Sequence, residues 1–204
     1  MCKQRMNLFI LLFSVVNFAS ATSIVCPGKS GFQASAKFVY CGPAVCKPNS
    51  DGSTATCKDC YQLVGENVGT LSCEERVPKG NNYISSFSAR KSIVPGHEKQ
   101  PIVFCDANKN ADTIYADCLN APCTVTDNKK KLATCQCTLV KMEKGDSFAT
   151  EARSCTTPDR CNAPKGYILN GAPSAIVLPM VATVAKVTGQ SISDITCDPS
   201  QTPK

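Results

Sequence analysis

The chain of 204 residues contains 15 cysteines and no tryptophan, and its 22 basic and 16 acidic residues give a formal net charge of +6. This length allows one sizeable domain or two small ones. The positive charge is modest, and no basic face interleaved with aromatic residues is evident, so we expect no nucleic-acid binding. The cysteine content is typical of proteins that fold in an oxidising compartment and rely on disulfide bonds.

The first residues have the order of a secretory signal peptide. A positively charged start precedes an apolar run over residues 8–16, and small residues follow at 19–21. The run is too short to span a bilayer as a mature helix. We therefore expect cleavage near Ala21 and a secreted protein, extracellular or periplasmic; an uncleaved signal anchor is the alternative. Cleavage also removes Cys2, and the remaining 14 cysteines form an even number that allows complete pairing.

Most of these cysteines fall into two similar series of six. The spacing is C-x14-C-x4-C-x10-C-x2-C-x12-C in the first and C-x12-C-x4-C-x11-C-x1-C-x17-C in the second. Self-similarity of this kind indicates an internal duplication of a six-cysteine module. It predicts two halves, a first repeat with linker over 22–100 and a second repeat with C-terminal tail over 101–204.

We expect all 14 cysteines to form disulfide bonds. The first series should pair within itself, as should the second, while Cys161 and Cys197 tie the tail back near the second copy. The predicted disulfide cysteines are Cys26, Cys41, Cys46, Cys57, Cys60, Cys73, Cys105, Cys118, Cys123, Cys135, Cys137, Cys155, Cys161 and Cys197.

Within each copy the sequence predicts short strands joined by turns. Residues 38–40 and 133–135 have the β-branched and aromatic side chains that suit a strand. Residues 48–54 and 127–131 are rich in turn formers and are predicted to be hairpin loops, each flanked by strands that carry cysteines. A copy of about 50 residues is too small for a hydrophobic core alone, so disulfides of about 2–4 kcal/mol each should supply stability. The expected fold is small, disulfide-rich and mostly β, with long loops.

Residues 175–187 form the most hydrophobic stretch after the leader. About a dozen residues cannot span a membrane, so we expect no stable membrane insertion. Pro179 near the start and Gly189 after the end favour a short helix that packs on the core. The alternative is a strand, because valine and isoleucine are frequent here.

Three motifs imitate redox or metal sites. The C-x-x-C of residues 57–60 has the form of a thiol–disulfide oxidoreductase site. The second copy has C-x-C at 135–137, however, and cysteines two apart in a strand do not readily bond to each other. Disulfides are therefore favoured over redox catalysis or thiolate zinc binding. Residues 106–117 imitate a calcium loop but lack its glycine and final glutamate, so we interpret them as an Asx-rich turn. We expect no metal and no cofactor.

A catalytic set is difficult to assemble from this sequence. His97 is the only histidine and has no nucleophile elbow nearby. Carboxylate pairs can act as general acid and base, and the candidates by residue type are Glu74, Glu75, Asp106, Asp112 and Asp117. The sequence favours a non-enzymatic protein, with a secreted hydrolase that uses carboxylates or His97 as the alternative.

The favoured function is that of a secreted cysteine-rich binding protein, such as an effector, inhibitor or adhesin, with a protein or a cell surface as partner. Binding residues concentrate on loop tips of rigid scaffolds. The candidate binding residues are therefore Lys129, Lys130 and Lys131 in the second loop and Asp51 in the first. The alternative is that both loops are solvated turns.

Overall fold

The computed structural model describes residues 22–28, 36–42, 44–89, 92–94, 97–98, 100–107, 113–152, 154–156 and 161–198, with only the backbone for 92–94 and 97–98. The predicted signal peptide at 1–21 lies outside the described residues. The strands are β1 (Ile24–Cys26), β2 (Lys37–Tyr40), β3 (Val45–Pro48), β4 (Thr54–Val64), β5 (Asn67–Gly69), β6 (Asn82–Ile84), β7 (Phe87–Ser88), β8 (Ser92–Val94), β9 (His97–Glu98), β10 (Ile102–Asp106), β11 (Ile114–Asp117), β12 (Pro122–Asp127), β13 (Leu132–Lys141), β14 (Ser147–Glu151) and β15 (Ile168–Pro173). The helix α1 (Ser174–Thr188) and the short 3-10 helix η1 (Ile192–Asp194) follow.

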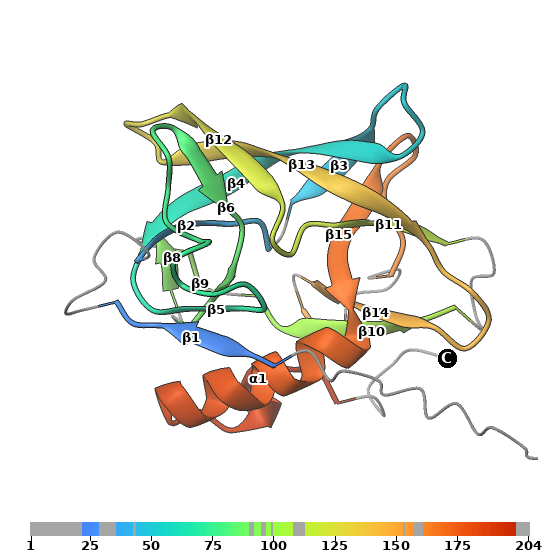
Figure 1. Cartoon of the computed structure of the whole chain (residues 1–204). Helices are drawn as coiled ribbons and strands as arrows, with labels where there is room; N and C mark the ends of the chain where they lie inside the picture. The colour runs from blue at the N-terminus through green and yellow to red at the C-terminus, as the bar shows by residue number, and fades with distance from the viewer. Residues whose placement is uncertain are drawn as a thin grey trace, which may run out of the picture.

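The two long strands β4 and β13 pair antiparallel at the centre and run across the top of the molecule in Figure 1. Each half contributes one of them, and two closed rings of strands share this pair. One ring is completed by β2, β6 and β12, with a parallel bridge between Val39 and Ser85. The other is completed by β3, β15 and β11. In the first ring β6 of the first half pairs with β12 of the second, and in the other ring β15 of the second half pairs with β3 of the first. The two halves are therefore interleaved.

Disulfide sulfur fills the interior of both rings. In the ring that contains β3, the Cys57 Sγ lies 3.3 Å from the Sγ atoms of both Cys118 and Cys137, so the Cys46–Cys57 and Cys118–Cys137 bridges pack together. In the other ring the sulfur atoms of Cys41, Cys60 and Cys135 lie within 4.8 Å of one another. The remaining interior consists mainly of alanine and valine. Sulfur thus supplies both the links and much of the packed volume of a core with few large side chains.

Each half contains two nested disulfides, whereas the last cysteines of the chain pair differently from the expected arrangement. In the first half the pairs are Cys26–Cys73, Cys41–Cys60 and Cys46–Cys57. In the second half Cys118–Cys137 and Cys123–Cys135 occupy corresponding places. The expected pairing of Cys161 with the tail is wrong: Cys161 bonds to Cys105, and Cys155 bonds to Cys197. Cys155 and Cys161 both follow β14, and all four cysteines lie in one hydrophobic cluster. The positions of the loops in the fold, rather than the spacing in the sequence, select the two pairs.

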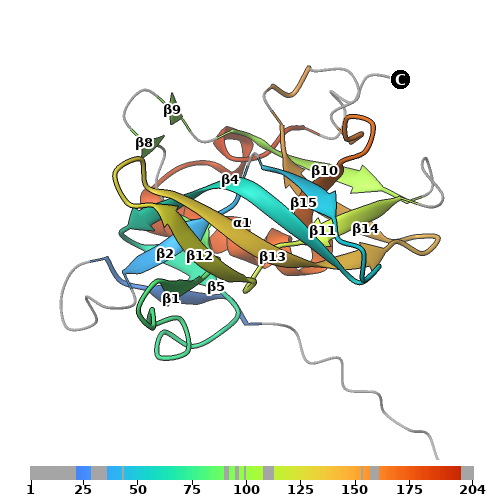
Figure 2. The ribbon, with the colours of Figure 1, turned by 90° about the horizontal axis from the view of Figure 1, so that it is seen from above.

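The helix α1 covers the lower side of the molecule (Figures 1 and 2). Its buried side chains Val177, Met180, Val181 and Val184 follow the i, i+3, i+4, i+7 spacing of one helix face. They pack with side chains of β5, β10, β14 and β15. Gly189 ends the helix with φ 68°, a left-handed conformation that glycine adopts without strain. Pro179 lies inside the helix at its sixth residue, whereas the sequence pattern predicts a position near the helix start.

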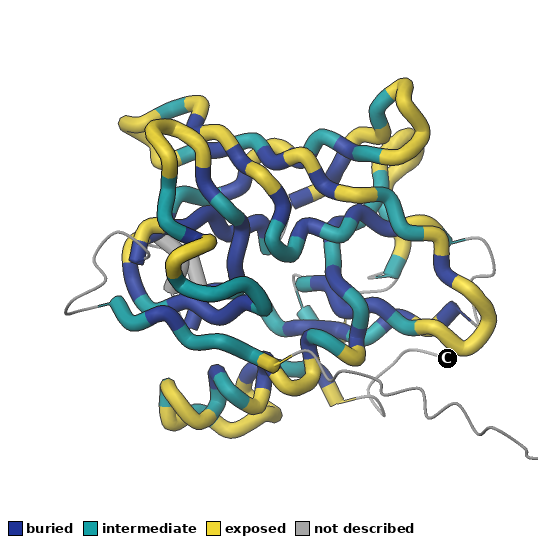
Figure 3. Tube along the Cα trace, viewed as in Figure 1, coloured by how far each residue is buried: buried dark blue, intermediate teal, exposed yellow. Residues whose placement is uncertain are grey.

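The mostly β, disulfide-rich fold with one C-terminal helix is confirmed, and the helix is favoured correctly over a strand. No described helix has both the length and the apolar character needed to cross a membrane. Figure 3 shows that buried residues follow the strands through the interior, while the exposed positions gather at the turns and along the outer side of α1. Three parts of the molecule are therefore candidates for a functional site. They are the turns, the outer surface of the sheet around β4 and β13, and the cavity between the two rings and α1.

Candidate functional site

The turn that carries the three predicted binding lysines connects β12 to β13. Lys129, Lys130 and Lys131 are all exposed. The Asp127 Oδ1 accepts hydrogen bonds from the backbone N–H groups of Lys129 and Lys130, each at 2.9 Å. Lys131 has φ 59°, and its carbonyl accepts a hydrogen bond from the Gln62 N–H at 2.7 Å. The backbone of this turn is thus fixed, while its ammonium groups extend into solvent.

Asp51, the other predicted binding residue, lies in the exposed turn between β3 and β4. Its Oδ1 accepts hydrogen bonds from the N–H groups of Ser53 and Thr54, each at 2.9 Å, and its Oδ2 accepts one from the Thr54 hydroxyl at 2.6 Å. The Thr54 hydroxyl, followed by the backbone N–H groups, lowers the pKa of the Asp51 carboxyl below its ordinary value. The carboxylate of Asp51 is therefore engaged within its own turn.

A disulfide lies beneath each turn. Cys46 pairs in register with Cys57 below the first turn, and Cys123 pairs in register with Cys135 below the second. Each pair is bonded, with Cα atoms 4.1 and 4.0 Å apart. The predicted hairpins with cysteines on their flanking strands are therefore present, and each turn is held on a crosslinked two-stranded ribbon.

The two turns lie at opposite ends of the central ribbon, because β4 and β13 run antiparallel (Figure 1). The pairing extends from Thr54 opposite Thr138 to Leu132 opposite Tyr61. At a rise of about 3.4 Å per residue, the turns are separated by roughly 24 Å. They do not form one local patch, and a single partner would have to lie along the sheet between them.

The sheet surface between the turns is polar and rich in threonine, and we call it the upper sheet face. The Asn49 amide joins two of its strands, since its Nδ2 donates to the Gln136 Oε1 at 3.1 Å and its Oδ1 accepts from the Thr56 hydroxyl at 2.8 Å. The residues that define the face, all exposed or half-buried, are Thr56, Thr124, Thr126, Thr134, Gln136 and Thr138.

The candidate catalytic residues are not brought together among the residues that the structure describes. The side chain of His97 lies outside those residues, as do residues 108–112 of the calcium-like loop, which include Asp112. Glu74 and Asp106 are exposed. The Glu75 carboxylate accepts the Ser72 N–H at 2.9 Å, which lowers its pKa. Asp117 is half-buried, and its Oδ1 accepts a hydrogen bond from the Leu119 N–H at 3.0 Å.

The cysteine motifs that imitate redox or metal sites are accounted for by disulfides. Cys57 and Cys60 bond to Cys46 and Cys41 rather than to each other. Asp59, with φ 60°, lies where the register between β4 and β13 shifts, and this irregularity lets both cysteines reach an interior. Two groups of three sulfur atoms lie close together, but every member is bonded to another cysteine and offers no thiolate.

A cavity of about 80 Å³ lies between the two rings and α1. Its apolar wall comes from five elements of both halves, with Phe87, Ile102, Leu119, Val177 and Met180 as its larger side chains. This volume is sufficient for several water molecules or for a ligand of a few heavy atoms.

Two polar side chains that line the cavity, Ser86 and Glu151, each have an oxygen atom without a hydrogen-bond partner among the described residues, Oγ and Oε2 respectively. Thr150 precedes Glu151 in β14, so its side chain lies on the other face of the strand, beside Val103, and its Oγ1 has no described partner there. Ser86 and Thr150 are each 5% exposed. A buried polar atom without a partner is unfavourable by about 1–3 kcal/mol.

Glu151 also links the two halves, because the Tyr40 hydroxyl donates a hydrogen bond to its Oε1. Burial raises the pKa of Glu151 well above its ordinary value, and a hydrogen bond from the Gln100 backbone opposes this shift. Burial of this carboxyl therefore favours its neutral form over the carboxylate. Gly42 faces this pair closely: a Cβ there would lie 2.5 Å from the Glu151 Oε2.

Corresponding hydrogen bonds hold the strand ends on the two sides of the cavity. The Ser85 hydroxyl donates to the Cys118 carbonyl, and the Asn170 side-chain amide donates to the Cys41 carbonyl. Each bond joins a segment of one half to a cysteine of the other. The cavity is thus built where the interleaved halves meet, on groups that are fixed by both disulfides and hydrogen bonds.

Sequence reasoning missed Tyr40 and Glu151, which are 111 residues apart. Glu151 is the last residue of β14, where a charged residue commonly faces solvent. Only the packing of α1 and the neighbouring ring over this strand end buries its carboxyl. The sequence contains no local signal for that arrangement.

Comparison of the chain with models of known protein families, with curated proteins and with solved structures finds no match.

Proposed function

We propose that the protein is secreted after cleavage of its signal peptide and binds another protein or a cell surface through the upper sheet face and the two turns beside it. The carrying observation is that each turn is fixed twice, by a disulfide below it and by an aspartate that accepts two of its backbone N–H groups. Preordered turns lose little conformational entropy on binding, which favours a binding role.

The charge of the second turn indicates where on the upper sheet face an anionic region of the partner would bind. Lys129, Lys130 and Lys131 place three exposed cations together at one end of the threonine-rich upper sheet face, and Lys47 lies beside Thr56 towards its other end. An anionic partner region at that end would gain a contact that weakens with salt. Asp51 contributes by shaping the first turn, since its carboxylate is occupied within it.

The test compares crosslinking from two faces of the oxidised, secreted chain. A photoreactive benzoylphenylalanine replaces Thr126 on the upper sheet face or, as the control, exposed Ala182 on the outer side of α1. On intact cells and extracellular matrix we expect a discrete, saturable crosslinked product from position 126 and none from 182. Equal products from both positions, or none from 126, would contradict the proposal.

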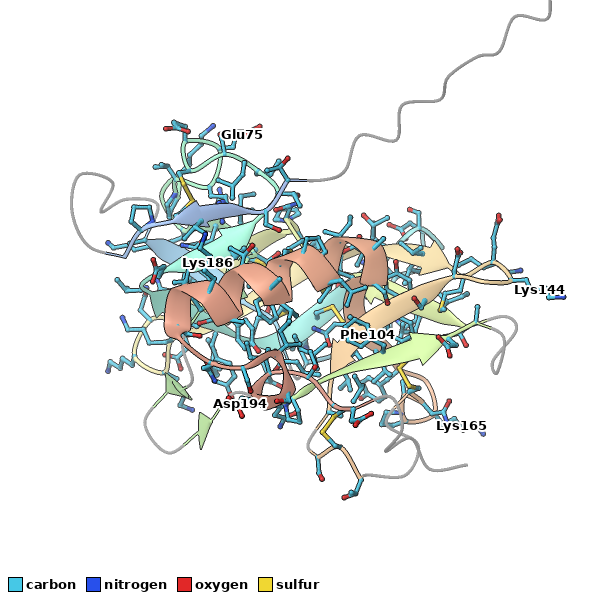
Figure 4. The ribbon with its side chains drawn as sticks, turned by 90° about the horizontal axis from the view of Figure 1, so that it is seen from below. Glu75, Phe104, Lys144, Lys165, Lys186 and Asp194 are labelled. Carbon is cyan, nitrogen blue, oxygen red and sulfur yellow. A yellow bond between two sulfur atoms is a disulfide. The ribbon has the colours of Figure 1, made fainter. Side chains whose placement is uncertain are left out.

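A matched charge test follows on the captured partner. Substitution of all three turn lysines with alanine should weaken binding several-fold at low salt, with a smaller effect at high salt. The control replaces Lys144, Lys165 and Lys186 with alanine, which removes the same charge. These three lysines are exposed and are labelled in the view from below (Figure 4). Turnover of a glycan, peptide or phosphodiester that is lost in His97→Ala would instead support a hydrolase.

A further inference from the structure

We propose that the partner of the upper sheet face is a sulfated polysaccharide chain of the cell surface or extracellular matrix, which lies along β4 and β13. This inference rests on the proposed function, because it names the chemistry of the partner at the same face. Three observations carry it: the composition of the face, a row of lysines along it and the register of its hydroxyl and amide groups.

The composition of the upper sheet face is unlike that of a protein-binding surface. Its defining residues are five threonines and one glutamine, and Val45 on β3, which is 40% exposed, is a large apolar side chain at its border. Protein–protein interfaces have an apolar core, and the residues that dominate their binding energy are enriched in tryptophan, tyrosine and arginine, with threonine under-represented. A hydrophilic polymer therefore matches this face better than a protein does.

Exposed lysines extend along the length of the face. Lys47 on β3 lies beside Thr56, and Lys58 is two residues further along β4. Each follows a buried cysteine, so its side chain projects outwards by the alternation of a strand. The three turn lysines follow beyond Tyr61, roughly 17 Å along the ribbon from Thr56 at about 3.4 Å per residue. We call Lys47, Lys58 and the three turn lysines the lysine row.

Carboxylates near the lysine row compensate only part of its charge. Asp51 and Asp127 each accept two backbone N–H groups of their turns, and Asp59 is exposed next to Lys58. Five lysines and three aspartates leave a positive surface that complements a polyanion. The lysines lie closer together than the charges of a polysaccharide with one carboxylate per disaccharide, so the higher charge density of a sulfated chain fits the row better.

Hydroxyl and amide groups of the face stand in register for hydrogen bonds to a polymer. Thr124 lies opposite Thr134, and Thr56 lies opposite Gln136. Polar groups therefore recur at about 4.8 Å between strands and about 7 Å along them. The Asn49 amide donates to the Gln136 Oε1 and fixes its side chain. Hydroxyl groups both donate and accept hydrogen bonds, so they can bind sugar hydroxyls as well as sulfate oxygens, and groups fixed in advance lose little entropy.

The experiment titrates the oxidised chain with a heparin hexasaccharide in a calorimeter at about 50 and about 200 mM salt. We expect a dissociation constant of about 1–50 µM at the lower salt and much weaker binding at the higher, because the ammonium groups displace counterions from the polyanion. The desulfated hexasaccharide, a hyaluronan fragment and a polyglutamate peptide of equal charge should bind at least about tenfold more weakly. Equal or tighter binding of polyglutamate, or no binding of the sulfated hexasaccharide, would overturn the proposal.

Two double variants test the assignment to this face. Lys47→Ala with Lys58→Ala should weaken hexasaccharide binding about tenfold and reduce its salt dependence. Thr124→Val with Thr134→Val keeps the shape and strand preference of both residues but removes two hydroxyls, and should weaken binding about threefold with unchanged salt dependence. The three-lysine control on the lower side of the molecule (Figure 4) should change affinity less than about twofold. Full affinity in either double variant, or an equal loss in the control, would overturn the proposal.

Crosslinking on cells separates this inference from the proposed function. The chain with benzoylphenylalanine at position 126 is applied to cells before and after enzymatic removal of sulfated glycans. We expect the crosslinked product to disappear after removal. A product that persists would overturn this inference and leave the proposed function intact, whereas no product from untreated cells would contradict both.

Discussion

Replacement of Asp117 with asparagine should make this protein more stable at neutral pH. Asp117 ends β11, and burial raises the pKa of its carboxyl from the ordinary 3.8 to about 6, against a hydrogen bond from the Leu119 N–H at 3.0 Å. The folded state therefore binds a proton more tightly than the unfolded state. Its contribution to stability is complete below pH 3.8 and is lost as pH rises to about 6.

The difference of about two pH units, at about 1.4 kcal/mol per unit, corresponds to a loss of at most roughly 3 kcal/mol in the free energy of unfolding. Asparagine carries no charge at any pH, and its Oδ1 can still accept the Leu119 N–H. The variant and the parent should therefore have similar stability at pH 3. At pH 7 the variant should be more stable by up to roughly 3 kcal/mol, or about 6–12 °C in melting temperature.

Urea unfolding of the oxidised proteins, followed by circular dichroism from pH 3 to pH 8, measures this difference. Glu151 shifts in the same direction but is present in both proteins, so it cancels in the comparison. Asp106→Asn removes the same charge from an exposed strand position and serves as the control, with a much smaller pH-dependent effect. Parallel stability profiles for parent and Asp117→Asn would refute the assignment of a buried, proton-binding carboxyl.

Three further perturbations follow from the packing. Gly42→Ala should reduce stability by roughly 1–3 kcal/mol in urea unfolding, because a Cβ there would lie 2.5 Å from the Glu151 Oε2; unchanged stability would contradict the close approach. Thr150→Val should raise stability by about 1 kcal/mol, since it replaces a buried hydroxyl without a partner by a methyl group, and a loss in stability would show that the hydroxyl has a partner. Removal of the Cys155–Cys197 bridge by a double serine substitution should lower stability by about 4 kcal/mol from the chain entropy of its loop. Peptide mapping without reduction should recover these two cysteines linked, and a different partner for either would contradict the pairing.

The interleaved rings explain how a chain without tryptophan forms a core. Four disulfides occupy the ring interiors in two packed pairs, each pair with one bridge from either half. A bridge here excludes water like an apolar side chain and also restricts the unfolded chain. The larger side chains are left for the lower part of the molecule, where α1 covers β10, β14 and β15.

Local sequence patterns determined the elements and the crosslinked hairpins. Asp-Gly and Asp-Asn segments between cysteines 11 and 12 positions apart specify a turn on two strands, and the structure pairs Cys46 with Cys57 and Cys123 with Cys135. Gly189 marks the end of the C-terminal helix because a left-handed residue is required there. These features depend on neighbours within about a dozen residues, so the sequence alone is sufficient to predict them. The duplication of the six-cysteine module remains an interpretation of spacing.

Tertiary structure decided which distant groups meet. Cys105 pairs with Cys161 and Cys155 with Cys197, although spacing favoured another arrangement, because the position of a loop in space selects among cysteines of equal chemistry. The same holds for the cavity. In the sequence, Glu151 is a polar residue at the end of a strand. Its carboxyl is buried and hydrogen-bonded to Tyr40 only because α1 and the first half pack against it. Burial and long-range contact are properties of the packed chain, so no local pattern of residues encodes them.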